Sequence, residues 1–365
     1  MSSKKIFITG STGFLGSYIL REILVQTDAD IILLVRGRSQ YEAEARVFNI
    51  LKDFFKHRFF KNRLNRIKVL KGDIMLSNFG FKKSEYKNLI RNIDEIYHSA
   101  ATTDLGIKIV QARLINLVGT KSIIKFAKNC IKLSKIHYIS TAFIAGTKEG
   151  LFKENDLFVK QDFNNAYEQS KFEAELLFRY YGKNKVKIVI YRPSIIIGEY
   201  KSGKTTSFKM FYQPLRFFYN EFFEAVPLNP NTLYNLIPVD VAAKTIVFLA
   251  LNYNRSSVFH IVSKQNILLG HIMDICSNYL SFKKPAYISR EQFDRMNIGP
   301  IRKKMIEPFL GYFNFKAIFD NTKTLKVLGN LGFKLSKIND NYIYRILEYC
   351  IKSNFLKNRN NSSFK

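Results

Sequence analysis

Short runs of apolar residues alternate with longer segments of helical periodicity in the first half of the chain. Ile6–Ile8 and Ile31–Val35 are such runs, and each has the length and composition of a strand buried on both faces. Between them, apolar residues recur at helical spacing at Leu15, Tyr18, Ile19, Ile23 and Leu24. The pattern predicts a strand, a helix and a second strand.

The same alternation continues to about residue 191. Further strands are predicted at Ile67–Leu70, Glu95–Ala101, Ile136–Ile139 and Val186–Tyr191. Helices are predicted over Tyr41–Lys56, through Asn116 and Gly119 to Ala127, and from Tyr167 onward. Strands that alternate with helices predict an α/β fold, a Rossmann-type doubly wound parallel sheet, because right-handed crossovers place helices on both faces.

After Gly198 the pattern loosens. Lys204–Pro230 is rich in Phe, Tyr and Lys without a strand period, so core packing, a cap, a lid and a membrane-touching amphipathic segment all remain open. Leu236–Val241 then opens a helix, and Val258–Val262 reads as another strand. We therefore expect a dinucleotide-binding domain of residues 1–200 plus about 236–263. A smaller, mostly helical C-terminal substrate-binding domain or cap would comprise about 201–235 plus 264–365, with short helices and loops after Asn266 and a basic tail over Lys352–Lys365.

Three glycines, Gly10, Gly13 and Gly16, lie between the first strand and the first helix with the spacing G-x-x-G-x-x-G. Glycines at such a junction let the backbone turn sharply and approach a pyrophosphate, which binds the free N–H groups at the start of the helix. A purely structural turn is the alternative. The strand before the loop and the helix after it favour a dinucleotide site.

Arg36 follows the second predicted strand, with Arg38 close by, and no acidic residue lies between Arg36 and Glu42. An acid at this position favours NAD, whereas an arginine accommodates the 2′-phosphate of NADP. The sequence thus predicts NADPH and a reductive direction, unless Arg36 is only a surface residue.

Tyr167 and Lys171 are four residues apart and so share one face of a helix. A neighbouring cation favours the phenolate and would lower the tyrosine pKa from its ordinary value of ~10, which suits acid–base chemistry. Lys171 could also hold a ribose hydroxyl. The preceding strand ends in Ser140-Thr141, and either hydroxyl could donate to a substrate carbonyl.

Together, the glycine triplet, Ser140–Gly146, Tyr167-x-x-x-Lys171 and Arg192-Pro-Ser resemble an extended short-chain dehydrogenase/reductase. Within that superfamily the chain is most similar to the thioester reductase and fatty acyl-CoA reductase (male-sterility-type) group. The similarity rests on Leu34-Val-Arg36 with Arg46 downstream, Gly72-Asp73-Ile74, His98-Ser-Ala-Ala101, Tyr167-Glu-Gln-Ser-Lys-Phe-Glu-Ala-Glu175 and Arg192-Pro-Ser-Ile-Ile-Ile-Gly198.

The resemblance implies roles for individual residues. Tyr167 would be the general acid, Lys171 its electrostatic partner, and Thr141, five positions before Gly146, the carbonyl donor. Asp73 would contact the adenine, and Pro193 and Ser194 would lie beside the nicotinamide. The implied cofactor-binding residues are Gly10, Thr12, Gly13, Phe14, Leu15, Gly16, Arg36, Arg46, Asp73, Ile74, Ala100, Tyr167, Lys171, Pro193 and Ser194. His98 stays outside the catalytic set, and Asn116 is either part of a proton relay or a buried amide with a backbone partner.

The function that these residues predict is NADPH-dependent reduction of an acyl thioester, bound to coenzyme A or to a carrier protein, to an aldehyde or alcohol. Alternatives on the same fold are a nucleotide-sugar epimerase, dehydratase or reductase and a hydroxysteroid-type dehydrogenase. Outside catalysis, a cofactor-sensing protein and a membrane-surface scaffold remain open.

Net charge and composition limit the classes of molecule that this protein is expected to bind. The 58 Lys and Arg residues against 29 Asp and Glu give a formal net charge of +29, which suits an anionic cofactor, a coenzyme A ester, an acidic carrier protein or a membrane surface. Compositional drift is the alternative, and nucleic acid is disfavoured because no recognition motif accompanies the charge.

Cys130, Cys276 and Cys350 have no paired spacing, so we expect neither a disulfide framework nor a metal site. No apolar run approaches the ~18 residues of a membrane span. With no apolar signal core near Met1, the expectation is a cytoplasmic protein, with peripheral membrane contact left open.

Overall fold

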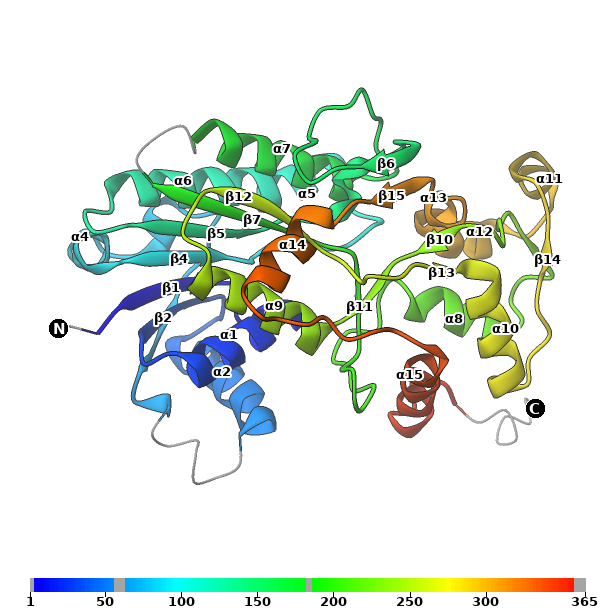
Figure 1. The fold of residues 1–365 in the computed structure, drawn as a ribbon, viewed down its shortest axis with the longest axis horizontal. Helices are drawn as coiled ribbons and strands as arrows, with labels where there is room; N and C mark the ends of the chain where they lie inside the picture. Colours follow the sequence, from blue (N-terminus) through cyan, green and yellow to red (C-terminus); the bar gives the residue numbers. More distant parts are fainter. Residues whose placement is uncertain (1–2, 56–62, 182–185, 358–365) are drawn as a thin grey trace.

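The computed structural model describes residues 3–55, 63–181 and 186–357, and its centre is a seven-stranded sheet (Figure 1). The strand order is β12-β7-β5-β4-β1-β2-β3, and every neighbouring pair is parallel. The strands are β1 (Lys5–Thr9), β2 (Asp30–Val35), β3 (Ile67–Lys71), β4 (Glu95–His98), β5 (Lys135–Ile139), β7 (Lys187–Pro193) and β12 (Ser257–Ile261). Because all strands run the same way, the segments that follow them meet at one edge of the sheet.

Helices cover both faces of the sheet (Figure 1). On one face lie α1 (Phe14–Gln26), α2 (Gln40–Phe54) and α9 (Val239–Asn252), and on the other α4 (Lys83–Asn92), α6 (Gly119–Asn129) and α7 (Ala166–Tyr181). Successive residues of β1 point to opposite faces, with Ile6 and Ile8 in one core and Phe7 in the other. This three-layer arrangement confirms the predicted Rossmann-type fold.

The helix predicted through Asn116 is interrupted by a π-helical turn. The segment runs as α5 (Ile109–Arg113), the π turn Leu114–Val118 and then α6. Within the turn, the Asn116 side chain accepts a hydrogen bond from Thr102 N (2.8 Å) and donates one to Ser170 Oγ (2.9 Å). Asn116 thus ties the loop after β4 to α7, so the backbone partner considered for it is present.

Some predicted boundaries differ from the observed ones or fall on residues that are not described. β4 ends at His98, not at Ala101, because the chain turns there to pass beneath Gly10. The predicted end of α2 at Lys56 falls outside the described residues, as does most of the basic tail.

A second region packs around its own aromatic core beside the sheet (Figure 1). Its helices are α8 (Tyr212–Tyr219), α10 (Leu269–Leu280), α11 (Arg290–Arg295), α12 (Pro300–Ile306), α13 (Leu310–Phe313) and α15 (Asp340–Lys352). Short strands pair within it and at its edge: β8 (Ile195–Ile197) with β11 (Leu236–Pro238), β10 (Leu233–Tyr234) with β13 (Ile267–Leu268), β9 (Ala225–Val226) with β14 (Ala286–Tyr287), and β6 (Gly150–Phe152) with β15 (Ala317–Phe319). The aromatic residues of α8 are mostly buried, so core packing accounts for that part of Lys204–Pro230.

The chain passes between the two regions more than once. β12 forms the edge of the sheet and α9 packs on α1, as the predicted return to the first domain requires. α14 (Thr322–Asn330) also packs on β12, although the sequence assigned it to the second domain. The proposed division into cofactor and substrate domains stays a prediction. In the described ranges, no helix combines the length and apolarity needed to cross a membrane.

A buried ion pair joins α7 to β7. The Arg192 guanidinium donates to both carboxylate oxygens of Glu175, at 2.7 and 3.1 Å, and a further nitrogen lies 3.1 Å from His260 Nε2. Both side chains of the pair are fully buried. Burial alone would raise the pKa of Glu175, but the Arg192 guanidinium holds it below its usual value.

Replacing Arg192 by leucine should lower the free energy of unfolding by about 3–5 kcal/mol, because it leaves the Glu175 carboxylate buried without its main partner. Urea unfolding followed by circular dichroism measures the loss. The matched control is Arg290→Leu, which removes a half-exposed partner of Asp294 and should cost far less. Equal losses in the two variants would contradict a special role for the buried pair.

Candidate active site

The glycine loop between β1 and α1 is packed so tightly that neither Gly10 nor Gly16 could carry a side chain. A Cβ atom at Gly16 would lie 2.0 Å from Gly10 O, and one at Gly10 would lie 2.4 Å from Ala100 N. Gly10 also has a φ of +75°, which favours glycine. The bare backbone opens onto the first turn of α1, whose N–H groups have no side-chain cap from Gly13. Such a cradle fits the pyrophosphate of a dinucleotide.

Two arginines lie beside this loop, where β2 ends. Arg46, on α2, donates to Thr12 Oγ1 (3.1 Å) and to the carbonyl oxygen of Arg36 (2.5 Å), while the Arg36 side chain is exposed. These contacts fix positive charge next to the glycine loop, where the sequence expected a 2′-phosphate.

Two further predicted cofactor-binding residues, Asp73 and Ile74, lie in the turn after β3. The Asp73 carboxylate accepts a hydrogen bond from Met75 N (2.9 Å). Ile74 packs closely on Gly119, because a Cβ atom added to Gly119 would lie only 2.4 Å from Ile74 Cδ1. The roles of these two residues toward a cofactor stay predictions.

Thr141, which follows β5, and Tyr167 of α7 line the same cavity, and the Thr141 side chain lowers the Tyr167 pKa as a hydrogen-bond partner. Thr141 Oγ1 also lies 3.5 Å from Pro193 O and accepts from Phe143 N at 3.2 Å. The neighbouring Ser140 hydroxyl donates to Glu175 Oε2 (2.6 Å). Since Ser140 is engaged by a buried carboxylate, the hydroxyl placed at Tyr167 is that of Thr141.

Lys171 is buried and points along the same side of α7 as Tyr167. Its ammonium donates to Ile139 O (2.7 Å) and lies 4.4 Å from the centre of the Tyr138 ring. Burial lowers the pKa of Lys171 to about 7. Burial also raises the pKa of Tyr167 to about 12, although the hydrogen bond to Thr141 opposes this rise. The expected lowering of the Tyr167 pKa by Lys171 is therefore wrong for this arrangement, because desolvation dominates and the ammonium is directed at Ile139.

One cavity of about 550 Å³ brings the glycine loop and these three residues together. Of the predicted site residues, it is lined by Gly10, Thr12, Gly13, Phe14, Leu15, Gly16, Thr141, Tyr167, Lys171, Pro193 and Ser194. The other predicted site residues do not line the cavity: Arg36, Arg46, Asp73, Ile74 and Ala100. The backbone of Ala100 instead packs directly against Gly10. His98 also lies away from the lining, between the hydroxyls of Thr9 (2.8 Å) and Thr120 (3.1 Å).

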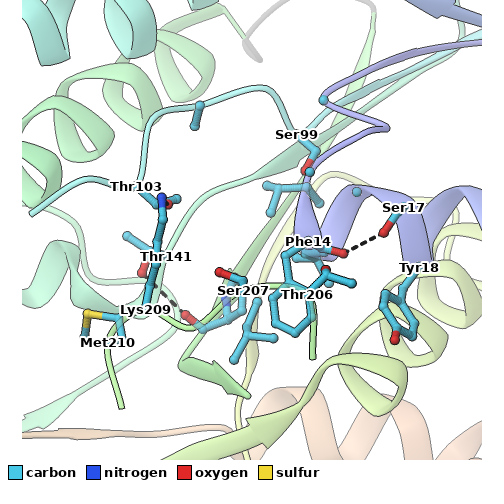
Figure 2. Close-up of a pocket in the computed structure, with 18 of the residues that line it drawn as sticks. Phe14, Ser17, Tyr18, Ser99, Thr103, Thr141, Thr206, Ser207, Lys209 and Met210 are labelled. Carbon is cyan, nitrogen blue, oxygen red and sulfur yellow. Dashed lines mark hydrogen bonds between the residues drawn. The ribbon is translucent and has the colours of Figure 1, made fainter. Parts of the chain in front are cut away.

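Several lining residues come from segments that no motif marked. Thr206, Ser207, Lys209 and Met210 line the cavity, and Figure 2 shows Lys209 and Met210 on the opposite side from Phe14 and Tyr18 of α1. Lys209 reaches Thr103, its Nζ 3.3 Å from Thr103 Oγ1. Only the unusual composition of Lys204–Pro230 hinted at this wall in the sequence, and nothing hinted at Tyr312, which lines the cavity from α13.

The family model described as male sterility protein, an NAD-binding family, matches residues 8–246. The chain belongs to this family. It is 30% identical over 240 residues to the fatty acyl-CoA reductase wat of Drosophila melanogaster, and 27% identical over 265 residues to a component of the linear gramicidin synthase of Brevibacillus parabrevis. These alignments cover 58% and 70% of this chain but only 46% and 5% of the two relatives.

A solved structure, the terminal R domain from the myxalamid PKS-NRPS biosynthetic pathway, shares the fold. It superposes with a TM-score of 0.82 at 23% sequence identity, covering 98% of this chain and 93% of that one. The male sterility family match and this architecture together establish an NAD(P)-binding domain.

In this family member, the residue after Tyr167 is a buried acid that connects α7 to α13. Glu168 accepts hydrogen bonds from Tyr312 Oη (2.7 Å) and from Asn164 N (2.9 Å). Asn165 Nδ2 donates to the same Tyr312 hydroxyl (2.7 Å). Burial raises the pKa of Glu168 to about 7, and the hydrogen bonds only partly offset it.

Glu168 should make the protein less stable as the pH rises from about 4.5 to 7. Over that range the unfolded chain releases the proton that the folded carboxyl retains, so the folded state must bear the cost of ionising it. Stability is fully present below the unfolded pKa, and the loss levels off above the folded one. The shift corresponds to a loss of at most about 3 kcal/mol.

Glu168→Gln, which is neutral at every pH, provides the comparison. Urea unfolding of both proteins at pH 5 and pH 8 should show that wild type loses more stability than the variant between the two values. Parallel changes in the two proteins would contradict the raised pKa.

Proposed function

We propose that this protein is an NADPH-dependent reductase that transfers hydride to the carbonyl of an acyl thioester, giving an aldehyde or, after a second reduction, an alcohol. The observation that carries the proposal is the cluster of Thr141, Tyr167 and Lys171 in the same cavity as the glycine loop. Its hydroxyls are poised to act on a carbonyl that is held beside a dinucleotide.

In the proposed mechanism NADPH, when bound, supplies the hydride. The Thr141 and Tyr167 hydroxyls donate hydrogen bonds to the thioester oxygen and stabilise the negative charge that develops there, as preorganised donors do. Tyr167 then provides a proton to that oxygen. To stabilise the resulting phenolate, the Lys171 ammonium would have to leave its present acceptor, Ile139 O. The hydroxyl of the resulting hemithioacetal then returns its proton to Tyr167 as the carbon–sulfur bond breaks. The sulfur takes up a proton from solvent, so the thiol leaves and the aldehyde remains.

The names of the relatives support a thioester as the substrate, since one is a fatty acyl-CoA reductase. Lys204 and Lys209 in the cavity wall would suit the phosphates of coenzyme A or of a carrier-bound pantetheine. We extend the proposal to an acidic carrier protein as a partner, which the net charge of +29 would favour. Contact with a membrane surface is a weaker extension that rests on the same charge.

The choice of NADPH over NADH rests on Arg36 and Arg46. Arg36 directly follows β2, and Arg46 of α2 is anchored on Thr12 of the glycine loop and on the carbonyl oxygen of Arg36. Arginine is suited to a phosphate because its planar guanidinium presents several N–H donors at once.

Tyr167→Phe and Thr141→Val should each lower kcat with acyl-CoA by about 10²–10⁴-fold, because each removes a proton donor at the reacting oxygen. NADPH oxidation and thiol release report the turnover. The Kd for NADPH should change less than threefold in Thr141→Val, which separates a chemical defect from a binding defect. Unchanged turnover in Tyr167→Phe would contradict the mechanism, and turnover of nucleotide sugars without any reduction of thioesters would contradict the function.

Arg36→Ala should weaken NADPH binding by about 10–100-fold, since a charge-assisted contact contributes about 1.5–3 kcal/mol, and should change NADH binding little. The enhancement of nicotinamide fluorescence on binding measures both Kd values, and the absence of tryptophan removes one source of background. Arg91→Ala, on the opposite face of the sheet in α4, is the matched control. Equal weakening of NADPH and NADH would contradict a 2′-phosphate contact.

A further inference from the structure

A second pocket adjoins the active-site cavity inside the C-terminal region. Ile195, Met210 and Tyr312 line both spaces and so form the partition between them. From α10, Leu269, Ile272, Met273 and Cys276 line the second pocket but not the cavity. The pocket therefore extends from the catalytic side toward α10.

The lining of this pocket is apolar. None of the described residues that line it carries a charge, and most are Ile, Leu, Met, Phe or Pro side chains. The Tyr312 hydroxyl, one of the few polar groups there, is already bonded to Glu168 and Asn165. A space with so few free polar partners holds water poorly and favours apolar ligands.

The partition is fixed relative to the catalytic tyrosine. Asn165 and Glu168 flank Tyr167 in the sequence, and both bind the Tyr312 hydroxyl. The Tyr312 ring packs against Phe143 with 5.4 Å between ring centres. A carbonyl held at Tyr167 would therefore have this partition, and the apolar pocket behind it, at a constant separation.

We propose that the pocket bounded by Ile195, Met210 and Tyr312 on one side and by α10 on the other receives the hydrocarbon chain of the acyl group and limits its length. The inference rests on the proposed function, because it assumes an acyl substrate. The pocket volume of about 40 Å³ holds about three water-sized spheres, and since a methylene is about as large as a water, roughly three carbons beyond the partition. Acyl groups of medium length fit this space, whereas longer chains exceed it.

Ile272 and Ile275 offer a matched pair of variants. Both are buried on α10, at 2% and 5% exposure, but only Ile272 lines the pocket. Ile272→Ala lengthens the pocket, whereas Ile275→Ala removes the same atoms elsewhere in the same core. Any general effect of a cavity on stability should be similar in the two proteins.

The binding test uses S-ethyl, S-octyl and S-dodecyl pantetheine, thioethers that cannot be reduced, in calorimetric titrations. For wild type, each added methylene should tighten binding about fourfold until the pocket is full. S-octyl pantetheine should thus bind at least a hundredfold more tightly than the S-ethyl compound, with no further gain for S-dodecyl. Ile272→Ala should bind S-dodecyl at least tenfold more tightly than S-octyl, and Ile275→Ala should keep the wild-type order. Ratios of Kd within one preparation are independent of the folded fraction.

Equal affinity of wild type for the three thioethers, or the same chain-length order in Ile272→Ala as in Ile275→Ala, would overturn the assignment of the pocket. Turnover of the corresponding acyl-CoA thioesters tests the proposed function separately. Reduction of thioesters without dependence on chain length would contradict only the pocket. Chain-length-dependent binding without any reduction would contradict only the function.

Discussion

The position of the candidate active site depends on one buried carboxylate, that of Glu175. Tyr167, Lys171 and Glu175 follow one another at four-residue intervals and share a face of α7. Glu175 binds Ser140, the neighbour of Thr141, and Arg192, the neighbour of Pro193. A buried charge is costly unless all its hydrogen-bonding capacity is used, so this carboxylate specifies the distance between α7, β5 and β7 closely. The hydroxyls of Thr141 and Tyr167 meet as a result.

The pKa values of two buried acids on α7 are shifted in opposite directions, and the cause of each shift can be identified. Glu175 lies against the Arg192 guanidinium, which outweighs burial and keeps its pKa low. Glu168 is equally buried but has only hydroxyl and amide donors, so burial prevails and its pKa rises to about 7. The first acid holds Ser140 and Arg192 at the candidate-site end of the sheet, and the second connects the same helix to Tyr312 in α13. Between them, the two buried acids link the two packed regions of the molecule to one helix.

The sequence was sufficient for the parts of the fold and site whose signals are local. Apolar runs such as Ile31–Val35 predicted the parallel strands, and the glycine spacing predicted a loop whose crowding at Gly16 admits no side chain. The sequence was insufficient for features that depend on tertiary contacts between residues far apart in the chain. Tyr312 is held at the cavity by a hydrogen bond to Glu168, which lies 144 residues away in the sequence. No local sequence pattern can predict a contact over such a separation. The direction of the Tyr167 pKa shift was missed for the same reason, because desolvation depends on everything packed around the phenol.

That raised pKa bears on the direction of the proposed reaction. At neutral pH a tyrosine with a pKa near 12 is a protonated phenol, the form that reduction requires, because the donor must give its proton to an oxygen that becomes negatively charged. Oxidation of an alcohol would need the phenolate instead, and the Lys171 ammonium that could stabilise it is bound to Ile139 O. The raised pKa therefore keeps Tyr167 in the protonated form from which a proton can be donated. The electrostatics of the acid–base pair and the two arginines beside β2 therefore support the same proposal, a reductase that uses NADPH.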